Sequence, residues 1–244
     1  MSVHLDPQAR GNATMIAGIE KNAELQSPRS ALNVRIVQRT AAVLALLVFA
    51  LPAMMTAALI WFSLGRPLLF RQVRSGLGGR SFTLVKFRTM HDIRDINGQL
   101  LPDVERETAL TRLIRAVRFD EIPQFLAILA GEMDFVGPRP LQPATMAAFG
   151  PLGMVRCRVR PGLTGWAQVN GNTRLSDTEK LALDIWYIDH RSIALDARIL
   201  LLTAATLVRG ERTRANHIAA ALAHLRARSD GVAAGDRLAR RAAP

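Results

Sequence analysis

The chain is 244 residues long, which is enough for one domain with a sizeable core, and it carries a formal charge of +12. Arginine supplies nearly all of the basic charge, so the composition predicts an anionic partner, which could be a phosphorylated substrate, anionic lipid or nucleic acid. The single Cys157 excludes an internal disulfide and a cysteine-based metal cluster, and the scarce aromatic residues, which do not alternate with basic ones, lead us to expect no nucleic-acid partner.

A polar extension and a long apolar stretch open the chain. Residues 1 to 34 show no periodicity, which predicts a largely unstructured segment without a secretory signal. Between Arg39 and Arg66 no charged residue occurs, and this stretch meets the length of about 20 apolar residues that a membrane helix needs. Basic residues flank both ends, which favours the cytoplasmic side for both, and Pro52 at the midpoint removes an internal hydrogen bond. We therefore expect a re-entrant helix over 35 to 66 that enters the inner leaflet, breaks at Pro52 and returns, with a straight span as the alternative.

Strand-like residues on both sides of the glycine-rich residues 75 to 79 predict a β-hairpin. Alternation along its second strand puts Lys86 and Arg88 on one face and Phe87 on the other, and two cations on one face suit phosphate oxygens. A solvated face of an edge strand is the alternative. The polar, turn-rich residues 91 to 107 predict a loop or short helices.

Two adjacent carboxylates, Asp120 and Glu121, precede Pro123 and an apolar run that ends at Gly131. Proline is favoured in the first turn of a helix and glycine just past its end, so the pattern predicts a helix with both carboxylates at or just before its start. Neighbouring side chains there lie about 100° apart and can face one small ligand together. Arg115, in a helix expected around 108 to 117, is the candidate for holding a phosphate near Asp120. Capping of the helix by acidic residues is the alternative.

Two further segments carry groups suited to binding a ligand. Pro138 and Pro140 bias Arg139 and its neighbours to extended backbone, and a rigidly placed arginine is a good fork for phosphate or carboxylate. Residues 160 to 171 form a glycine-punctuated loop with basic, hydroxyl and amide groups. Its candidate groups are those of Arg160, Thr164 and Gln168.

Two apolar helices and a basic tail end the chain. Ser176 and Glu179 form a capping box ahead of a helix that runs to 189, and a second apolar helix spans 195 to 208. These helices are expected either to pack in the core or to lie on a membrane interface. From Arg209 onward alanine and arginine dominate, which predicts a loose basic helix or a disordered tail.

Five segments, taken in order, resemble the bacterial sugar transferase family, the monotopic polyprenyl-phosphate hexose-1-phosphate transferases. They are Phe70-Arg71-Gln72, Lys86-Phe87-Arg88-Thr89-Met90, Asp120-Glu121-Ile122-Pro123-Gln124, Gly137-Pro138-Arg139-Pro140-Leu141, and residues 160 to 171. The resemblance covers residues 36 to 208 and implies an α+β fold: a re-entrant membrane helix and a small helical domain with a β-hairpin and interfacial amphipathic helices. The implied parts are a polar extension (1–34), the membrane helix (35–66), the catalytic domain (67–208) and a basic tail (209–244).

The resemblance also implies a reaction. A UDP-sugar gives its sugar 1-phosphate to undecaprenyl phosphate and releases UMP, at the first membrane step of exopolysaccharide or O-antigen assembly. Asp120 would carry a covalent phosphosugar, and Glu121 would assist through Mg²⁺. The remaining residues would bind the substrates and neutralise their charge: Lys86, Arg88, Arg115, Pro138, Arg139, Pro140, Arg160, Thr164 and Gln168.

The family's location would be the cytoplasmic face of a bacterial inner membrane, in contact with anionic lipid, and whether the chain forms a homodimer stays open. The sequence departs from the family at Arg118-Phe119, where Ser-Leu is common before the acidic pair, and at Leu51, where some relatives carry Ser. The alternative function is a non-catalytic basic adaptor on the membrane surface.

Overall fold

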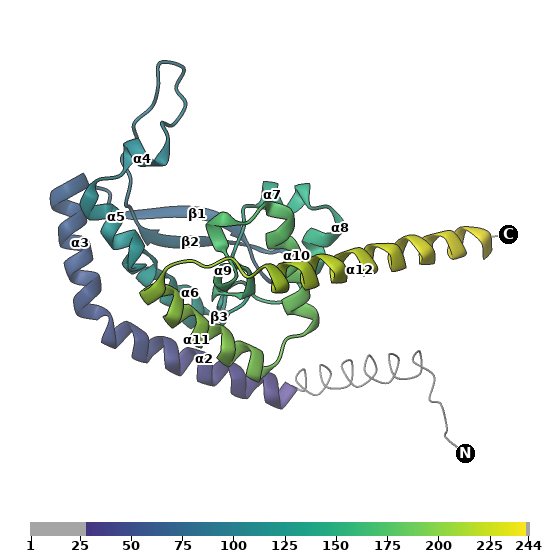
Figure 1. Cartoon of the computed structure of the whole chain (residues 1–244). Coiled ribbons are helices and arrows are strands. Elements are labelled where there is room, and N and C mark those ends of the chain that lie inside the picture. Colours follow the sequence, from purple (N-terminus) through teal and green to yellow (C-terminus); the bar gives the residue numbers. More distant parts are fainter. Residues whose placement is uncertain (1–27, 243–244) are drawn as a thin grey trace.

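Two helices at the edge of the molecule form one bent arm. The computed structural model describes residues 28–242, and its first helices, α2 (Pro28–Val48) and α3 (Ala50–Leu64), meet at 57° (Figure 1). Pro52 has no N–H to donate to Val48, and its ring crowds that carbonyl, so the helix breaks one turn before the proline. Across residues 28–242 no single helix is long and apolar enough to cross a bilayer, and only this bent pair passes the length and composition test together. The predicted break is confirmed, whereas residues 1–27 of the predicted extension lie outside the described residues.

The arm has one buried and one exposed apolar face. Ala42, Thr56 and Ile60 are buried against the body, and Gln38 Oε1 accepts a 3.0 Å hydrogen bond from the Phe135 amide. The opposite face exposes large apolar side chains, namely Leu44, Leu47, Val48, Leu51, Met54, Met55 and Phe62. A contiguous apolar surface of this kind marks a site of contact with a partner or a membrane.

The predicted hairpin is confirmed as the antiparallel pair β1 (Leu69–Ser75) and β2 (Ser81–Phe87). A short 3₁₀ turn, η1 (Leu77–Gly79), connects the strands, and Gly78 and Gly79 both have positive φ there. On β2 the side chains of Phe82 and Leu84 are buried in a core cluster with Ile122 and Ile128, and Lys86 lies on the same face by alternation. This register directs the lysine inward, toward the segment that carries the acidic pair.

A loop projects from the body before the central helices (Figure 1). It contains a bridge between Arg94 and Leu100 and the short helix α4 (Asp103–Arg106). The chain then returns through α5 (Ala109–Ala116), the 3₁₀ helix η2 (Phe119–Gln124) and α6 (Phe125–Ala130). Gly131 ends α6 with φ 82°, as the sequence predicts for a glycine just past a helix.

A parallel pair of short strands, β3 (Asp134–Val136) and β4 (Gly162–Thr164), forms the second sheet. The connection between them carries α7 (Pro143–Ala148) and α8 (Pro151–Arg156). A side chain on Gly162 would collide with the backbone of Gly137, which explains why glycines punctuate this region. After β4 follow two short helices, α9 (Trp166–Val169) and η3 (Asn172–Arg174).

Three longer helices complete the molecule and pack a second core cluster: α10 (Asp177–Asp189), α11 (Ile193–Arg209) and α12 (Ala215–Ala242). The capping box of Ser176 and Glu179 at the start of α10 is confirmed. The tail forms a helix, which is one of its two predicted forms, but the first turns of that helix are not loose, because Ile218, Ala221 and Leu225 of α12 are buried in the same cluster as α10. Their helical spacing makes an apolar stripe that the alanine and arginine content conceals.

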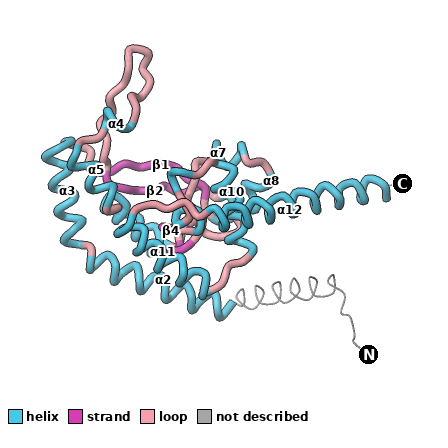
Figure 2. The backbone as a smooth tube through the Cα atoms, in the orientation of Figure 1, coloured by secondary structure: helices cyan, strands magenta, loops and turns pink. Residues whose placement is uncertain are grey.

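The α+β class is confirmed, with helices dominating and two small sheets (Figure 2). Of the two expectations for the helix over 195 to 208, core packing holds for one face of α11, where Ile199 is fully buried. Its other face exposes apolar side chains, which are Ile193, Leu200, Leu201, Leu207 and Val208.

Candidate active site

The acidic pair lies in the 3₁₀ helix η2, one turn before the predicted helix begins. Pro123 is inside η2 and α6 starts only at Phe125, so the expectation of a first-turn proline is corrected. The cause is Arg118, which has left-handed φ/ψ of 59° and 24° and turns the chain sharply after α5. Its carbonyl accepts a 3.1 Å hydrogen bond from the Glu121 amide. The turn directs both carboxylates inward, and Asp120 is 6% and Glu121 7% exposed.

Glu121 is held by two guanidinium groups. Arg139 Nη2 donates to its Oε1 at 2.9 Å, and Arg118 Nη1 lies 3.5 Å from its Oε2. Burial raises the pKa of Glu121, but the charges of Arg139 and Arg118 outweigh burial and leave it below the usual value. Glu121 is therefore a fixed anion.

Asp120 has a different environment. Burial, and then the charge of Glu121, raise the pKa of Asp120 from 3.8 to about 6, against the opposing charges of Lys86 and Arg115. At neutral pH Asp120 is thus mostly ionised, yet it is poorly solvated. A carboxylate in this state is a suitable nucleophile toward phosphorus.

Two of the predicted cations face the pair. Lys86 Nζ lies 5.6 Å from the centre of the Phe70 ring, and burial lowers the pKa of Lys86 although Asp120 and Glu121 act to raise it. Arg115 lies in the last turn of α5, 3.5 Å from a Glu107 oxygen, and its charge acts on Asp120 and Lys86. The structure therefore brings Lys86 and Arg115 to the pair, as the sequence predicts.

Other predicted residues make contacts elsewhere. Because β2 ends at Phe87, Arg88 lies beyond the strand, and its Nη2 donates to the carbonyls of Leu64 (2.7 Å) and Gly65 (2.9 Å) at the end of α3. Arg88 is therefore not placed beside Lys86 on a phosphate-binding face. Pro52 lies in the bent arm, where it breaks the helix.

The glycine-punctuated loop makes structural contacts. Arg160 Nε donates to the Gly131 carbonyl at 2.8 Å, and Gln168 Nε2 donates to the Leu163 carbonyl at 3.3 Å. The hydroxyl of Thr164 pairs with that of Thr203 at 2.7 Å. Pro138 and Pro140, both buried, flank Arg139 and support its position instead.

Sequence reasoning missed Arg156, which holds the backbone of Arg139. Its Nε donates to Asp184 Oδ2 at 2.8 Å, its Nη2 donates to the Arg139 carbonyl, and both charged side chains are buried. Burial raises the pKa of Asp184, although the charge of Arg156 opposes this. No local pattern could have identified the pair, since its members are 28 residues apart.

The acidic pair offers two carboxylates to a magnesium ion but no complete set of protein ligands. Among residues 28–242 no three His, Cys, Asp or Glu side chains gather as a metal site. Mg²⁺ is often held by one or two carboxylates and completed by substrate phosphates and water. Asp120 and Glu121 supply carboxylates of that kind, although Arg139 and Arg118 already lie beside the two oxygens of Glu121, at 2.9 and 3.5 Å.

The sequence model of the bacterial sugar transferase family matches residues 29–210, which contain this entire acidic and basic cluster. The chain belongs to the bacterial sugar transferase family. The expectation that it is a sugar transferase is thereby confirmed.

Individual relatives agree with this membership. The transferase is 43% identical over 187 residues to the uncharacterized sugar transferase EpsL of Bacillus subtilis (strain 168), covering 76% of this chain and 93% of EpsL. It is 36% identical over 217 residues to the UDP-glucose:undecaprenyl-phosphate glucose-1-phosphate transferase of Caulobacter vibrioides, covering 83% of this chain and 79% of that protein. It is 39% identical over 186 residues to the undecaprenyl-phosphate glucose phosphotransferase of Komagataeibacter xylinus, covering 70% of this chain but only 35% of that longer protein.

Proposed function

We propose that the transferase moves a sugar 1-phosphate from a UDP-sugar to undecaprenyl phosphate, with release of UMP, through a covalent intermediate on Asp120. The observation that carries the proposal is the pair of buried neighbouring carboxylates with opposite pKa shifts, surrounded by Lys86, Arg115 and Arg139. The names of the Caulobacter and Komagataeibacter relatives support the two substrates. We place this reaction at the first membrane step of exopolysaccharide or O-antigen assembly, and the name of a relative from Rhizobium meliloti, the exopolysaccharide production protein ExoY, supports the exopolysaccharide role.

In the first step an oxygen of the ionised Asp120 carboxylate attacks the phosphorus that bears the sugar. A bond forms between that oxygen and phosphorus, and the bond from this phosphorus to the oxygen bridging the diphosphate breaks. UMP leaves with the electron pair, so no proton is required at Asp120. In the second step an oxygen of the lipid phosphate attacks the same phosphorus and the Asp120 carboxylate leaves, which restores the enzyme.

The surrounding charges favour both steps. When the diphosphate approaches Asp120, Lys86 and Arg115 offset the combined negative charge. Arg139 keeps Glu121 fixed beside Asp120. Mg²⁺, held by Glu121, would neutralise charge on the diphosphate when bound. Arg156 and the buried Pro138 and Pro140 hold the Arg139 backbone so that its guanidinium needs little reorganisation.

We further propose that the bent arm enters the inner leaflet and returns, with the catalytic domain on the cytoplasmic face. The exposed apolar face of α2 and α3 supports this placement, as does the 57° bend. Cysteines in place of Ile36 and Leu68 should react with a membrane-impermeant reagent from the same side. Reaction from opposite sides would establish a spanning arm.

Mg²⁺-dependent release of UMP from a UDP-sugar tests the enzymatic proposal. The purified transferase should release UMP in the presence of undecaprenyl phosphate, and the Asp120→Asn variant should not. Undiminished release by that variant would refute the role of Asp120. Absence of release from every common UDP-sugar would favour the basic adaptor instead.

A further inference from the structure

Arg118 occupies an unusual backbone conformation next to the acidic pair. It is a non-glycine residue in the left-handed region, which costs an L-residue with a side chain on the order of 1 kcal/mol. The conformation ends α5 and starts η2, so the chain places a long cationic side chain at the very turn that directs Asp120 and Glu121 inward.

The guanidinium of Arg118 is loosely held between two carboxylates. Nη1 lies 3.5 Å from Glu121 Oε2, and Nη2 lies 3.9 Å from Glu211 Oε1. Both separations exceed the range of roughly 2.7–3.2 Å for well-formed hydrogen bonds in proteins. Arg139, by comparison, contacts Glu121 at 2.9 Å. The Arg118 side chain is also 29% exposed, so its guanidinium is accessible to solvent and to a ligand.

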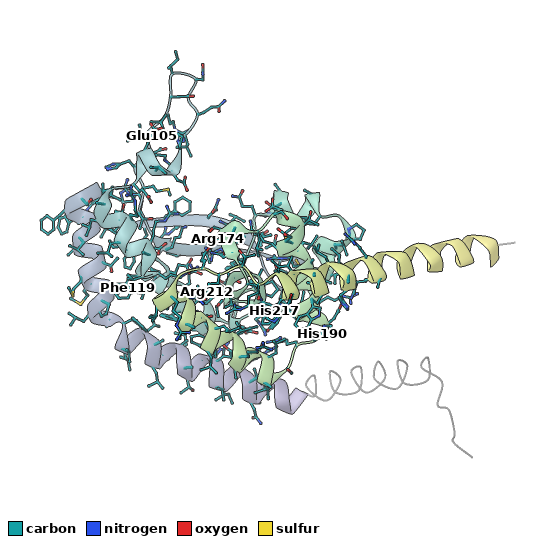
Figure 3. All side chains as sticks on the ribbon, viewed as in Figure 1. Glu105, Phe119, Arg174, His190, Arg212 and His217 are labelled. Atoms are coloured by element: carbon teal, nitrogen blue, oxygen red, sulfur yellow. The ribbon has the colours of Figure 1, made fainter. Side chains whose placement is uncertain are left out.

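Glu211, by contrast, is fixed. Asn172 Nδ2 donates to its Oε1 at 2.6 Å, and the amide and hydroxyl of Thr173 donate to its Oε2 at 3.2 and 2.6 Å. These contacts join η3 to the segment between α11 and α12 beside the acidic pair. Figure 3 labels Arg174 of η3 and Arg212 of the segment between α11 and α12, which are the chain neighbours of Thr173 and Glu211. Arg118 therefore lies beside a carboxylate that three hydrogen bonds hold in place.

Arg118 also supplies the cation that Arg88 does not. Nη2 of Arg88 donates to two carbonyls at the end of α3, which holds its guanidinium at that helix end, although its buried Nε has no hydrogen-bond partner. Arg118 and Arg139 stand on the two oxygens of Glu121, and together they present two guanidinium groups on the rim of the acidic pair. Two forked donors in this position match the geometry of diphosphate oxygens.

We propose that Arg118 binds the diphosphate of the nucleotide-sugar donor and that Glu211 holds its guanidinium in place until the donor arrives. This role rests on the proposed function. When the donor binds, Arg118 exchanges its long contacts to Glu121 and Glu211 for shorter ones to phosphate oxygens. Glu211 lies one residue beyond the part of the chain that the family model matches, so this feature extends the site past the family domain.

The test is Arg118→Asn, because asparagine tolerates the left-handed conformation and the exchange therefore removes the guanidinium without disturbing the turn. Binding of UDP, a donor analogue, to the purified full chain should weaken about tenfold, and the KM for the UDP-sugar should rise by a similar factor. Arg118→Lys keeps the charge but not the forked guanidinium, so its affinity for UDP should lie between those of the wild type and Arg118→Asn. Arg94→Asn makes the same exchange in the projecting loop and should bind UDP like the wild type.

The alternative role for Arg118 is only to hold Glu121, and it has a different signature. In that case Arg118→Asn lowers kcat while UDP binds as tightly as to the wild type, within twofold, and the proposal is overturned. If Arg118→Asn does not fold, unchanged UDP binding by Arg118→Lys overturns it equally. UMP release by the wild type is measured separately, so a wrong assignment of Arg118 is distinguished from a wrong reaction.

Discussion

Asp120 and Glu121 are neighbours in the chain and similarly buried, yet their partners shift their pKa values in opposite directions. Glu121 has a guanidinium at 2.9 Å, whereas Lys86 and Arg115 act on Asp120 through their charge and the hydrogen bond that lowers its pKa comes from its own backbone. Burial therefore dominates at Asp120 and the guanidinium charges dominate at Glu121. Such a split assigns different tasks to two identical functional groups.

The first prediction concerns the pH dependence of the reaction. Since the Asp120 carboxylate must be ionised to attack, and its pKa is about 6, the rate of UMP release should be constant above pH 7. Below pH 6 the rate should fall about tenfold per pH unit, because only the ionised fraction reacts. Initial rates between pH 5 and 8 at saturating Mg²⁺ measure this. A rate that stays flat through that range would contradict the assignment.

The second prediction concerns the stability of Asp120→Asn without added metal. The folded protein binds the Asp120 proton more tightly than the unfolded chain, so ionisation of Asp120 destabilises the fold: the penalty is absent below pH 4 and complete above pH 6. Asparagine escapes the penalty, and the shift from 3.8 to about 6 corresponds to a gain on the order of 3 kcal/mol at pH 7.5.

Thermal or denaturant unfolding in detergent at pH 4 and pH 7.5 measures that gain. Asp92→Asn, which changes an exposed carboxylate of the projecting loop, serves as the control and should leave stability nearly unchanged. If Asp120→Asn is no more stable than the wild type at pH 7.5, the raised pKa is wrong.

At the scale of elements, one buried arginine joins three segments. Arg156 at the end of α8 pairs with Asp184 in the middle of α10 and donates to the carbonyl of Arg139. The contact connects the second core cluster to the segment that positions the guanidinium on Glu121. A buried ion pair adds little net stability, but losing one partner leaves the other charge unpaired.

Arg156→Met should therefore destabilise the fold by about 3–5 kcal/mol. The double variant with Asp184→Leu removes both buried charges and should recover most of that loss. Equilibrium unfolding in denaturant gives both values. If the free energy of unfolding of Arg156→Met is within about 1 kcal/mol of the wild-type value, the ion pair of Arg156 and Asp184 is not formed in solution.

Elements specified by local sequence were predicted well from the chain alone. The hairpin, the capping box of Ser176 with Glu179, and the end of α6 at Gly131 depend on residues a few positions apart. The commitment of Arg88 to the end of α3 could not be predicted, since its partners are more than 20 residues away. The left-handed turn at Arg118 was also hidden, because arginine carries no preference for that region.

At the scale of the whole molecule, two core clusters meet at Phe135 of β3. One joins the bent arm, the hairpin and α6, and the other joins α10, α11 and the first turns of α12. Phe135 of β3 packs against both clusters, which connects them at the strand beside the Arg139 segment. The arm is thus coupled by packing to the catalytic segment rather than attached as a separate anchor.

The fourth prediction tests whether α12 belongs to the core. Ile218→Ala should lower the free energy of unfolding by about 2–4 kcal/mol, because the side chain is buried among those of the second cluster. Arg226→Ala, on the exposed face of the same helix, should change it by less than about 0.5 kcal/mol. Equal, small effects of the two substitutions would return α12 to the status of a loose tail.

In the proposed reaction Asp120 carries the transferring group. Incubating the purified transferase with a UDP-sugar and Mg²⁺ in the absence of lipid acceptor, followed by rapid acid quenching and peptide mass spectrometry, tests it most directly. We expect a sugar-phosphate adduct on the peptide that contains Asp120, formed with one equivalent of UMP and absent in Asp120→Asn. Release of UMP only when undecaprenyl phosphate is present, with no adduct at any quench time, would contradict it.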